Sequence, residues 1–447
     1  MLTVDQARDQ AAAIVAAARA AGADAADALV AADRSLDVSV RLGALEDVGR
    51  SESAELSLRV FCGKRSASVS SADFAPGALQ ALVERAVAMA RAAPEDEWAG
   101  LAPVERLLNG APPQLDLDDA AEPEPASLKA RALAAEEAAR AVPGVTNSEG
   151  ASASAHRGIV ALATSHGFAG GYASTTHGLS ASVLAGETGA MERDYAYATA
   201  RHLKHLEAPE AIGRRAGERA AARANPGRLE SGALPVVFDP RVGGSLLGHL
   251  LGAISGQAIA RKTSFLQDAL GTAIFAPSVT IHDDPHRPHG LRSRPFDGEG
   301  LAVSPIEIVR AGVLETWLLD SASARQLGLA PTGHAARGGA GVGVAPSNLY
   351  MAAGNVPPET LIGEIARGVY VTELIGMGVN GVTGDYSRGA AGFLIEDGQI
   401  TRPVSEFTIA GNLRDMFLAL TPANDLEFRY GINVPTLRID GLTVASG

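Results

Sequence analysis

Hydrophobic and polar positions change period twice within the first 100 residues of the chain. Residues 4–21 are rich in alanine and contain neither proline nor glycine, which predicts a helix. The following segments alternate apolar and polar side chains, which is typical of half-buried strands. A second helix is predicted over 76–93, because Pro76 suits the first helical turn and an apolar stripe follows. Strands are predicted at 36–42, 56–60 and 66–70, with a hairpin turn at 62–64.

The middle of the chain contains a proline-rich, acidic stretch at 111–125, which indicates an exposed connection. A helix is predicted over 127–141. Residues 145–203 contain strand-like segments separated by glycines, and we expect them to form hairpins of one sheet. A further helix, 209–224, is followed by Asn-Pro-Gly at 225–227, a strong stop signal that predicts a domain boundary.

The second half is predicted to be rich in strands. It begins with an apolar strand at 234–238 and a helix at 241–260, and the glycine-rich stretch 333–343 is predicted to be a loop. Together these patterns predict an α+β protein with two domains. The N-terminal domain, 1–225, combines helices with an antiparallel sheet, and the C-terminal domain, 226–447, is strand-rich and carries one glycine-faced helix. Further strands are predicted at 279–282, 306–309 and 313–318, and over much of 368–444.

The predicted helix 241–260 has an unusual polar side. Its apolar stripe faces one way, while Gly248, Gly252 and Gly256 lie on the other side with Ser245 and His249. Each glycine in a helix interior costs about 0.5–1 kcal/mol relative to alanine, so three of them suggest that something approaches this backbone closely. Two interpretations remain open: tight packing within the protein, or the wall of a ligand groove. The apolar stripe consists of Val242, Leu246, Leu250, Ile254 and Ala258.

Composition and charge narrow the class of protein. The 447 residues include 51 acidic and 38 basic side chains, a formal charge of −13, which argues against a nucleic-acid-binding surface. The start of the chain carries Asp5, Arg8 and Asp9, unlike a signal peptide, and no apolar run approaches the roughly 20 residues needed to span a bilayer. The one cysteine, Cys62, permits no internal disulfide. We therefore expect a cytoplasmic protein without a membrane or nucleic-acid partner.

A search for catalytic motifs yields no catalytic residue. None of the ten histidines is followed by glutamate, so the helical His-Glu pair of zinc hydrolases is absent from the sequence. Nucleophile-elbow and dinucleotide-binding motifs are also missing. One segment offers metal-ligand types, although its two prolines favour an extended loop whose side chains need not converge. This weak alternative metal site comprises His282, Asp284, His286 and His289.

Several motifs nevertheless resemble a known family. Residues 248–256 (GHLLGAISG), 261–266 (RKTSFL), 296–300 (FDGEG) and 332–335 (TGHA) contribute to the resemblance. The most specific motifs are VTGDYSRGA at 382–390 and VSEFTIAGNL at 404–413. The chain resembles the TldD/PmbA family over essentially its whole length, and within it the PmbA branch, also called TldE.

The resemblance implies a division of labour between two subunits. TldD is a zinc peptidase with His-Glu-x-x-x-His on the helix that corresponds to 241–260 and with a cysteine as third ligand, whereas TldE lacks these ligands. If His249 is aligned with the first histidine, Leu250 and Ile254 occupy the other two places; in the alternative frame the three places hold Gly248, His249 and Ala253. Neither alignment holds zinc. We expect no cofactor in this chain and zinc in a TldD-like partner.

These inferences lead to two hypotheses of function. The first is a non-catalytic subunit of a TldD/TldE-type metalloprotease that forms a substrate cavity for peptides or unfolded proteins, as a heterodimer with a zinc-bearing partner or as a homodimer. The second is a stand-alone peptide-binding or regulatory protein of the gyrase-modulator type. Arg388 is expected to orient a substrate or, alternatively, to form a salt bridge with Asp385. The predicted groove comprises His249, Gly252, Ser255, Gly256, Asp385, Tyr386, Ser387 and Arg388.

Overall fold

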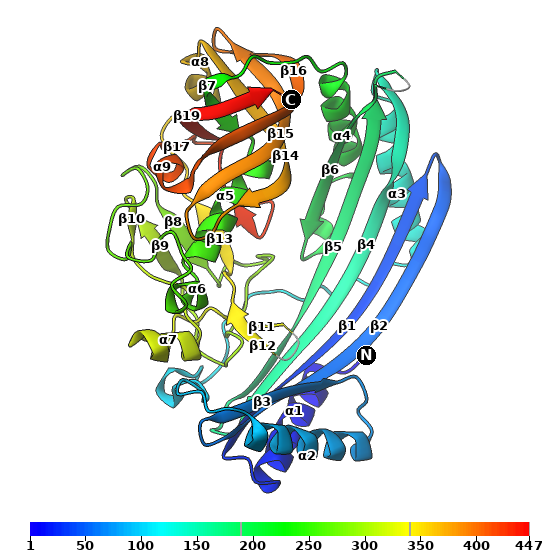
Figure 1. Ribbon diagram of the computed structural model, residues 1–447. Coiled ribbons are helices and arrows are strands. Elements are labelled where there is room, and N and C mark those ends of the chain that lie inside the picture. Colours follow the sequence, from blue (N-terminus) through cyan, green and yellow to red (C-terminus); the bar gives the residue numbers. More distant parts are fainter. Residues whose placement is uncertain (188–189, 339–340, 447) are drawn as a thin grey trace.

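The architecture was analysed on a computed structural model, which describes residues 1–187, 190–338 and 341–446. Its first half is built around one long, curved antiparallel sheet with strand order β3-β2-β1-β4-β5-β6 (Figure 1). The short alternating segments predicted from the sequence are parts of much longer strands, and the hairpins predicted at 145–203 join the same sheet as the earlier strands. The strands are β1 (Ala25–Arg41), β2 (Ala44–Cys62), β3 (Arg65–Ser71), β4 (Val145–Thr164), β5 (Ala169–Ala185) and β6 (Glu192–Ala200).

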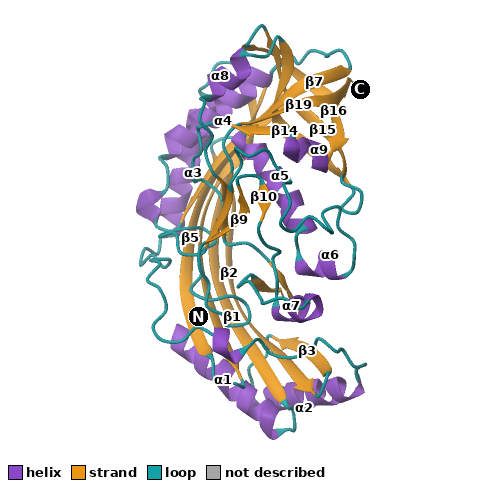
Figure 2. Ribbon diagram, turned by 90° about the vertical axis from the view of Figure 1, so that its left-hand side faces the viewer, coloured by secondary structure: helices purple, strands orange, loops and turns teal. Residues whose placement is uncertain are grey.

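Two pairs of helices cover this sheet, one pair at each end (Figure 2). Buried residues of α1 (Val4–Ala20) and α2 (Pro76–Ala92) form one apolar cluster with β1, β2 and β4. Those of α3 (Pro125–Arg140) and α4 (Pro209–Arg223) form a second cluster with β4, β5 and β6. All four predicted helices are confirmed to within two residues, because capping signals mark them: Thr3 caps α1, and the other three begin at proline.

The connection at 111–125 is more ordered than its composition suggests. Leu115 and Leu117 are buried, and the backbone amide of Thr175 in β5 donates a hydrogen bond to the carbonyl of Leu117. The amide of His289, from the second half of the chain, donates to the carbonyl of Leu115. The predicted exposed connection is confirmed for most of its residues, but Leu115 and Leu117 bury apolar surface and fix its middle part.

The second half contains a six-stranded sheet of order β16-β15-β14-β7-β19-β17 and a five-stranded sheet of order β10-β9-β8-β13-β18. Both sheets and α5 contribute to the largest apolar cluster of the protein. The strands are β7 (Gly232–Phe238), β8 (Ile281–Asp284), β9 (Ile306–Arg310), β10 (Val313–Leu314), β13 (Asn348–Met351), β14 (Arg367–Val379), β15 (Asp385–Glu396), β16 (Gln399–Asn412), β17 (Leu420–Pro422), β18 (Ile432–Asn433) and β19 (Leu437–Ser446). The helices are α5 (Pro240–Ala253), α6 (Gly256–Ala260), α7 (Ser321–Leu327), α8 (Pro358–Gly363) and α9 (Leu413–Leu418).

The glycine-rich stretch 333–343 differs from the prediction of a loop. Its described part forms a small hairpin of β11 (Ala335–Gly338) and β12 (Gly341–Val344), while residues 339 and 340 lie outside the described residues. The α+β fold class predicted from the sequence is confirmed, and the division at 225/226 stays a prediction. Among the described residues, none of the helices is both long and apolar enough to cross a bilayer.

Candidate functional site

Helix α5 presents an open backbone on one side. Asp239 caps the helix by accepting a hydrogen bond from the amide of Arg241, and it also accepts one from the Tyr370 hydroxyl at 2.9 Å. The side of α5 that carries Gly248 and Gly252 is open: a Cβ atom placed on either glycine would meet no described atom outside the helix within 4 Å. The buried side of the helix consists of Gly243, Leu246, Leu247, Leu250 and Ala253.

The predicted helix 241–260 is interrupted, which corrects one sequence expectation. It ends at Ala253, and Ser255 caps the separate helix α6 by accepting a hydrogen bond from Ala258. The amide of Gly256 donates to the carbonyl of Leu318, outside the helix. A Cβ on Gly256 would lie 2.3 Å from Ser323 Oγ of α7. Gly256 is therefore a close-packing glycine and does not share the open face of Gly248 and Gly252.

His249 lies on α5 against Tyr386 of β15. The two rings meet edge to face with centroids 5.9 Å apart. Burial, with a smaller contribution from the charge of Arg388, lowers the pKa of His249, and burial raises the pKa of Tyr386 to about 12. Both groups are therefore neutral at pH 7. His249 Nε2 and the Tyr386 hydroxyl are buried and have no hydrogen-bond partner among the described residues, so each has hydrogen-bonding capacity left.

The other predicted groove residues lie on strand β15, where neighbouring side chains point to opposite faces of the sheet. Asp385 and Ser387 are exposed, whereas Tyr386 between them is buried, as the alternation of a strand requires. Asp385 accepts hydrogen bonds from Thr383 Oγ1 at 2.6 Å and Asn412 Nδ2 at 3.2 Å. Arg388 Nε donates to the carbonyl of Ile375 at 3.2 Å. In the described part of the chain no ion pair joins Arg388 to Asp385, so that alternative is wrong.

Arg388 borders a cavity of about 590 Å³ between the two halves of the chain. Tyrosine side chains line one part of it: the Tyr195 and Tyr197 rings lie 6.2 Å apart, and Tyr197 is 5.3 Å from Tyr430. Sequence reasoning missed these residues, although Tyr195 and Tyr197 two positions apart on a predicted strand were a signal. The cavity is lined chiefly by Arg193, Tyr195, Tyr197 and Thr199 of β6, by Pro240, Arg241, Val242, Gly244 and Ser245 of α5, by Thr372–Leu374 of β14, by Arg388 of β15 and by Arg429–Ile432.

Buried charge pairs fix the walls of this cavity. Both terminal nitrogens of Arg241 donate to the carboxylate of Asp194, at 2.6 and 2.9 Å, and the Asp194 side chain is only 1% exposed. Burial acts to raise the pKa of Asp194, but the hydrogen bonds and charge of Arg241 outweigh it and lower this pKa. Arg223 lies 2.5 Å from Glu373 of β14. Helix α5 is thereby tied to β6, and α4 is tied to β14.

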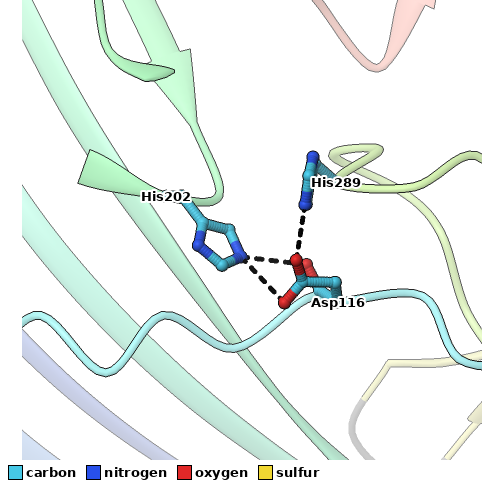
Figure 3. A group of neighbouring side chains, drawn as sticks. All are labelled: Asp116, His202 and His289. Atoms are coloured by element: carbon cyan, nitrogen blue, oxygen red, sulfur yellow. Dashed lines mark hydrogen bonds and ion pairs between the residues drawn. The ribbon is translucent and has the colours of Figure 1, made fainter. Parts of the chain in front are cut away.

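The α5 site does not fit a zinc ion held by this chain alone. Zinc sites in proteins use at least three protein ligands, and the two alignments place Ile254, or Gly248 and Ala253, where the histidines would stand. Within residues 1–187, 190–338 and 341–446, the group with suitable spacing for a metal is Asp116, His202 and His289, far from α5 in sequence (Figure 3).

The weak metal candidate in segment 282–289 is not assembled as predicted. The His282 ring stacks on Tyr350 with centroids 4.9 Å apart, and Asp284 Oδ1 accepts a hydrogen bond from the backbone of His286. His289 contacts Asp116 instead, with Nε2 2.7 Å from Oδ2. Of the four predicted ligands, His289 alone belongs to the described metal-like group, because the prolines extend the segment and separate its side chains.

Comparison with known proteins agrees with this fold. Three consecutive PmbA/TldA metallopeptidase family models match: domain 1 at residues 26–90, the central domain at 112–224 and the C-terminal domain at 231–446. The chain is 41% identical to metalloprotease PmbA of Escherichia coli O157:H7, over 94% of this chain and 92% of that protein. It is 37% identical to the PmbA homolog of Haemophilus influenzae, over 92% and 90% of the two chains. The chain belongs to the PmbA/TldD metallopeptidase family.

Solved structures extend the likeness to the whole fold. A proposed modulator of DNA gyrase from Bacteroides thetaiotaomicron superposes with a TM-score of 0.91 at 28% identity, covering 100% of both chains. TldE from Thermococcus kodakarensis superposes with a TM-score of 0.87 at 21% identity, covering 98% of this chain and 100% of that one, a likeness of fold. The family models and the PmbA relatives support the PmbA (TldE) branch predicted from the sequence motifs.

Proposed function

We propose that this chain is the zinc-free subunit of a two-component metallopeptidase that acts on peptides or unfolded proteins. One observation carries the proposal: α5, the helix that bears the zinc motif in TldD-type chains, offers His249 alone beside the open backbone of Gly248 and Gly252. A zinc-bearing, TldD-like partner would supply the metal, which activates water and polarises the scissile carbonyl. This chain would contribute the substrate cavity.

The cavity has the properties that a peptide site requires. Tyr195, Tyr197 and Tyr430 offer apolar faces to side chains, and Arg388 and Arg429 offer donors to backbone carbonyls or a terminal carboxylate. The Arg241–Asp194 ion pair holds α5 in the cavity wall, and it leaves Arg388 and Arg429 available to the substrate. Substrate would therefore meet a site that is largely formed before it binds.

The test compares the purified chain alone with the chain mixed with a TldD-like partner. We expect no peptide cleavage by the chain alone, and chelator-sensitive cleavage by a stoichiometric complex, measured with an unfolded protein and short fluorogenic peptides. Size-exclusion chromatography of the same mixture distinguishes a heterodimer from a homodimer. Chelator-sensitive cleavage by this chain alone, after contamination has been excluded, would falsify the proposal.

The regulatory alternative rests on a different observation: residues of this chain already form a cavity of about 590 Å³. A stand-alone peptide-binding protein would bind peptide with full affinity before any partner is added. Fluorescence anisotropy of a labelled peptide separates the two functions. Affinity that rises strongly on addition of the partner favours the peptidase subunit, whereas unchanged affinity without cleavage in the complex favours the regulator.

A further inference from the structure

Three segments far apart in the sequence bring histidines and a carboxylate together. Asp116 lies in the connection at 111–125, His202 follows β6, and His289 lies in the loop after β8 (Figure 3). We propose that these three side chains bind one divalent transition-metal ion, with Zn²⁺ as the ion that this donor set favours. The site is independent of α5 and of the proposed peptidase function.

The donor atoms already have the spacing of a shared coordination sphere. His289 Nε2 lies 2.7 Å from Asp116 Oδ2, and His202 Nε2 lies 3.2 Å from Asp116 Oδ1. All three donors lie within 4.8 Å of one another. Ligands at about 2.0–2.1 Å from a tetrahedral zinc ion stand about 3.3 Å apart. Small side-chain rotations are therefore sufficient to admit an ion, which would displace the shared protons.

A half-buried carboxylate lies beside one of the histidines. Asp119 Oδ1 lies 3.8 Å from His202 Nδ1, on the side of the ring that faces away from Asp116. Asp119 is itself held in place, because its Oδ2 accepts a hydrogen bond from the Leu203 amide at 2.7 Å. Carboxylates that hold the far nitrogen of a metal-binding histidine fix the tautomer that presents the other nitrogen to the metal. Asp119 Oδ2 also lies 3.2 Å from Nε2 of the buried His177, so this one carboxylate faces both histidines.

A further histidine lies beside the group. The His205 ring, in the short 3₁₀ helix Leu203–His205, is centred 4.9 Å from the His289 ring and 5.7 Å from the His202 ring. The fourth position of the site would be taken by water, or by His205 after a side-chain rearrangement. The exposed side chain of Asp116, at 62% of its full accessibility, leaves a path from solvent for the ion.

The backbone holds two of the ligands in an uncommon conformation. Asp116 has φ of 50° and His289 has φ of 57°, values in the left-handed region that non-glycine residues rarely adopt. The hydrogen bond from the His289 amide to the Leu115 carbonyl ties the two segments together at this point. Such strain persists where the surrounding structure requires it, and it is concentrated at functional sites.

Zinc titration of the chelator-treated, full-length chain tests the proposal, with calorimetry for stoichiometry and affinity and Co²⁺ absorption for the ligand field. We expect one zinc ion per chain and loss of stoichiometric binding in His289→Asn and Asp116→Asn. Asparagine is chosen because it tolerates the left-handed backbone. Asp119→Asn is expected to weaken binding by about 10–100-fold, the usual effect of removing a carboxylate that orients a ligand.

Two control variants separate this site from others. His156→Asn removes a histidine that pairs with Asp33 at 3.0 Å but belongs to no three-ligand group in the described part of the chain. His286→Asn removes a residue of the segment first suspected from the sequence. Both are expected to keep full zinc binding. Circular dichroism in the presence of chelator checks that every variant is folded. Absence of zinc binding by the wild-type chain, or equal binding by wild type and folded His289→Asn, would overturn the proposal.

Discussion

Two histidine-bearing regions of this protein contrast sharply. On α5, His249 stands beside glycines and an aromatic ring, with no second ligand type at the positions a zinc motif would use. At the junction of the two halves, His202 and His289 converge on Asp116 although no motif connects them. The comparison teaches that metal-binding capacity follows from the donors that a fold brings together, and that a helix inherited from a metallopeptidase family does not by itself provide them.

Arg388→Ala is expected to produce the largest effect on the cavity side of this comparison. If Arg388 holds peptide, its loss removes a charge-assisted hydrogen bond and weakens peptide capture by the assembled complex by roughly 1.5–3 kcal/mol. Within the described residues Arg388 donates one hydrogen bond, to the exposed Ile375, so folding and partner binding should be retained. Anisotropy of a labelled peptide measures the change.

Arg8→Ala on the exposed side of α1 serves as the matched control and is expected to leave peptide affinity unchanged. Unchanged affinity in a folded Arg388→Ala complex would leave Arg388 as a structural residue. An equal loss in His289→Asn would show that the cavity and the histidine cluster are not separate sites.

Gly252 and Gly256 lie in the same sequence motif, 248–256, but only Gly256 is closely packed. Gly256→Ala places a Cβ 2.7 Å from the Ser323 Cβ, and we expect a loss of about 1–3 kcal/mol in the free energy of unfolding from overpacking. Gly252→Ala meets open space within a helix and should instead stabilise the chain by about 0.5–1 kcal/mol. Urea denaturation of both variants checks these opposite signs. Equal destabilisation by both would show that the face of α5 is covered.

The smallest expected effect concerns the protonation of His249. Well above pH 6.5 the imidazole is neutral in both the folded and the unfolded state, and it adds no pH dependence. As the pH falls from 6.5 through the lower pKa of the folded state, the unfolded state binds a proton first, so stability is lost. NMR titration should give His249 a pKa below 6.5, and Arg388→Ala should raise that pKa while leaving it below 6.5, because burial is the larger cause.

Local sequence signals predicted much of the fold. Proline at the first position of α2, α3 and α4 located these helices, and alternation located parts of the long strands. The signals failed where a tertiary contact decides the outcome. The apolar stripe continues past Ala253, but the backbone of Gly256 bonds to Leu318, which lies about 60 positions further along the chain, and α5 ends. No local pattern contains that partner.

The candidate sites were less accessible from the sequence for the same reason. The motif at 382–390 pointed to Arg388, which borders the cavity. The motif was informative because its residues lie together on one strand, β15. Tyr430 and Thr372 joined the cavity only through the packing of distant segments. Likewise, Asp116 and His289 are 173 positions apart, so the sequence search grouped His289 with its neighbours in the chain instead of with its neighbour in space.

The order of strands also has a consequence for biosynthesis. In the first sheet, neighbouring strands such as β1 and β2 or β4 and β5 are joined by short turns, so the sheet is able to form while later residues are still being translated. The other six-stranded sheet is different, because β7 (Gly232–Phe238) pairs with β19 (Leu437–Ser446). One edge of β7 must therefore wait for about 200 further residues. During that interval a nascent chain exposes an apolar strand to chaperones, and ribosome pausing near the end of the message would lengthen the exposure.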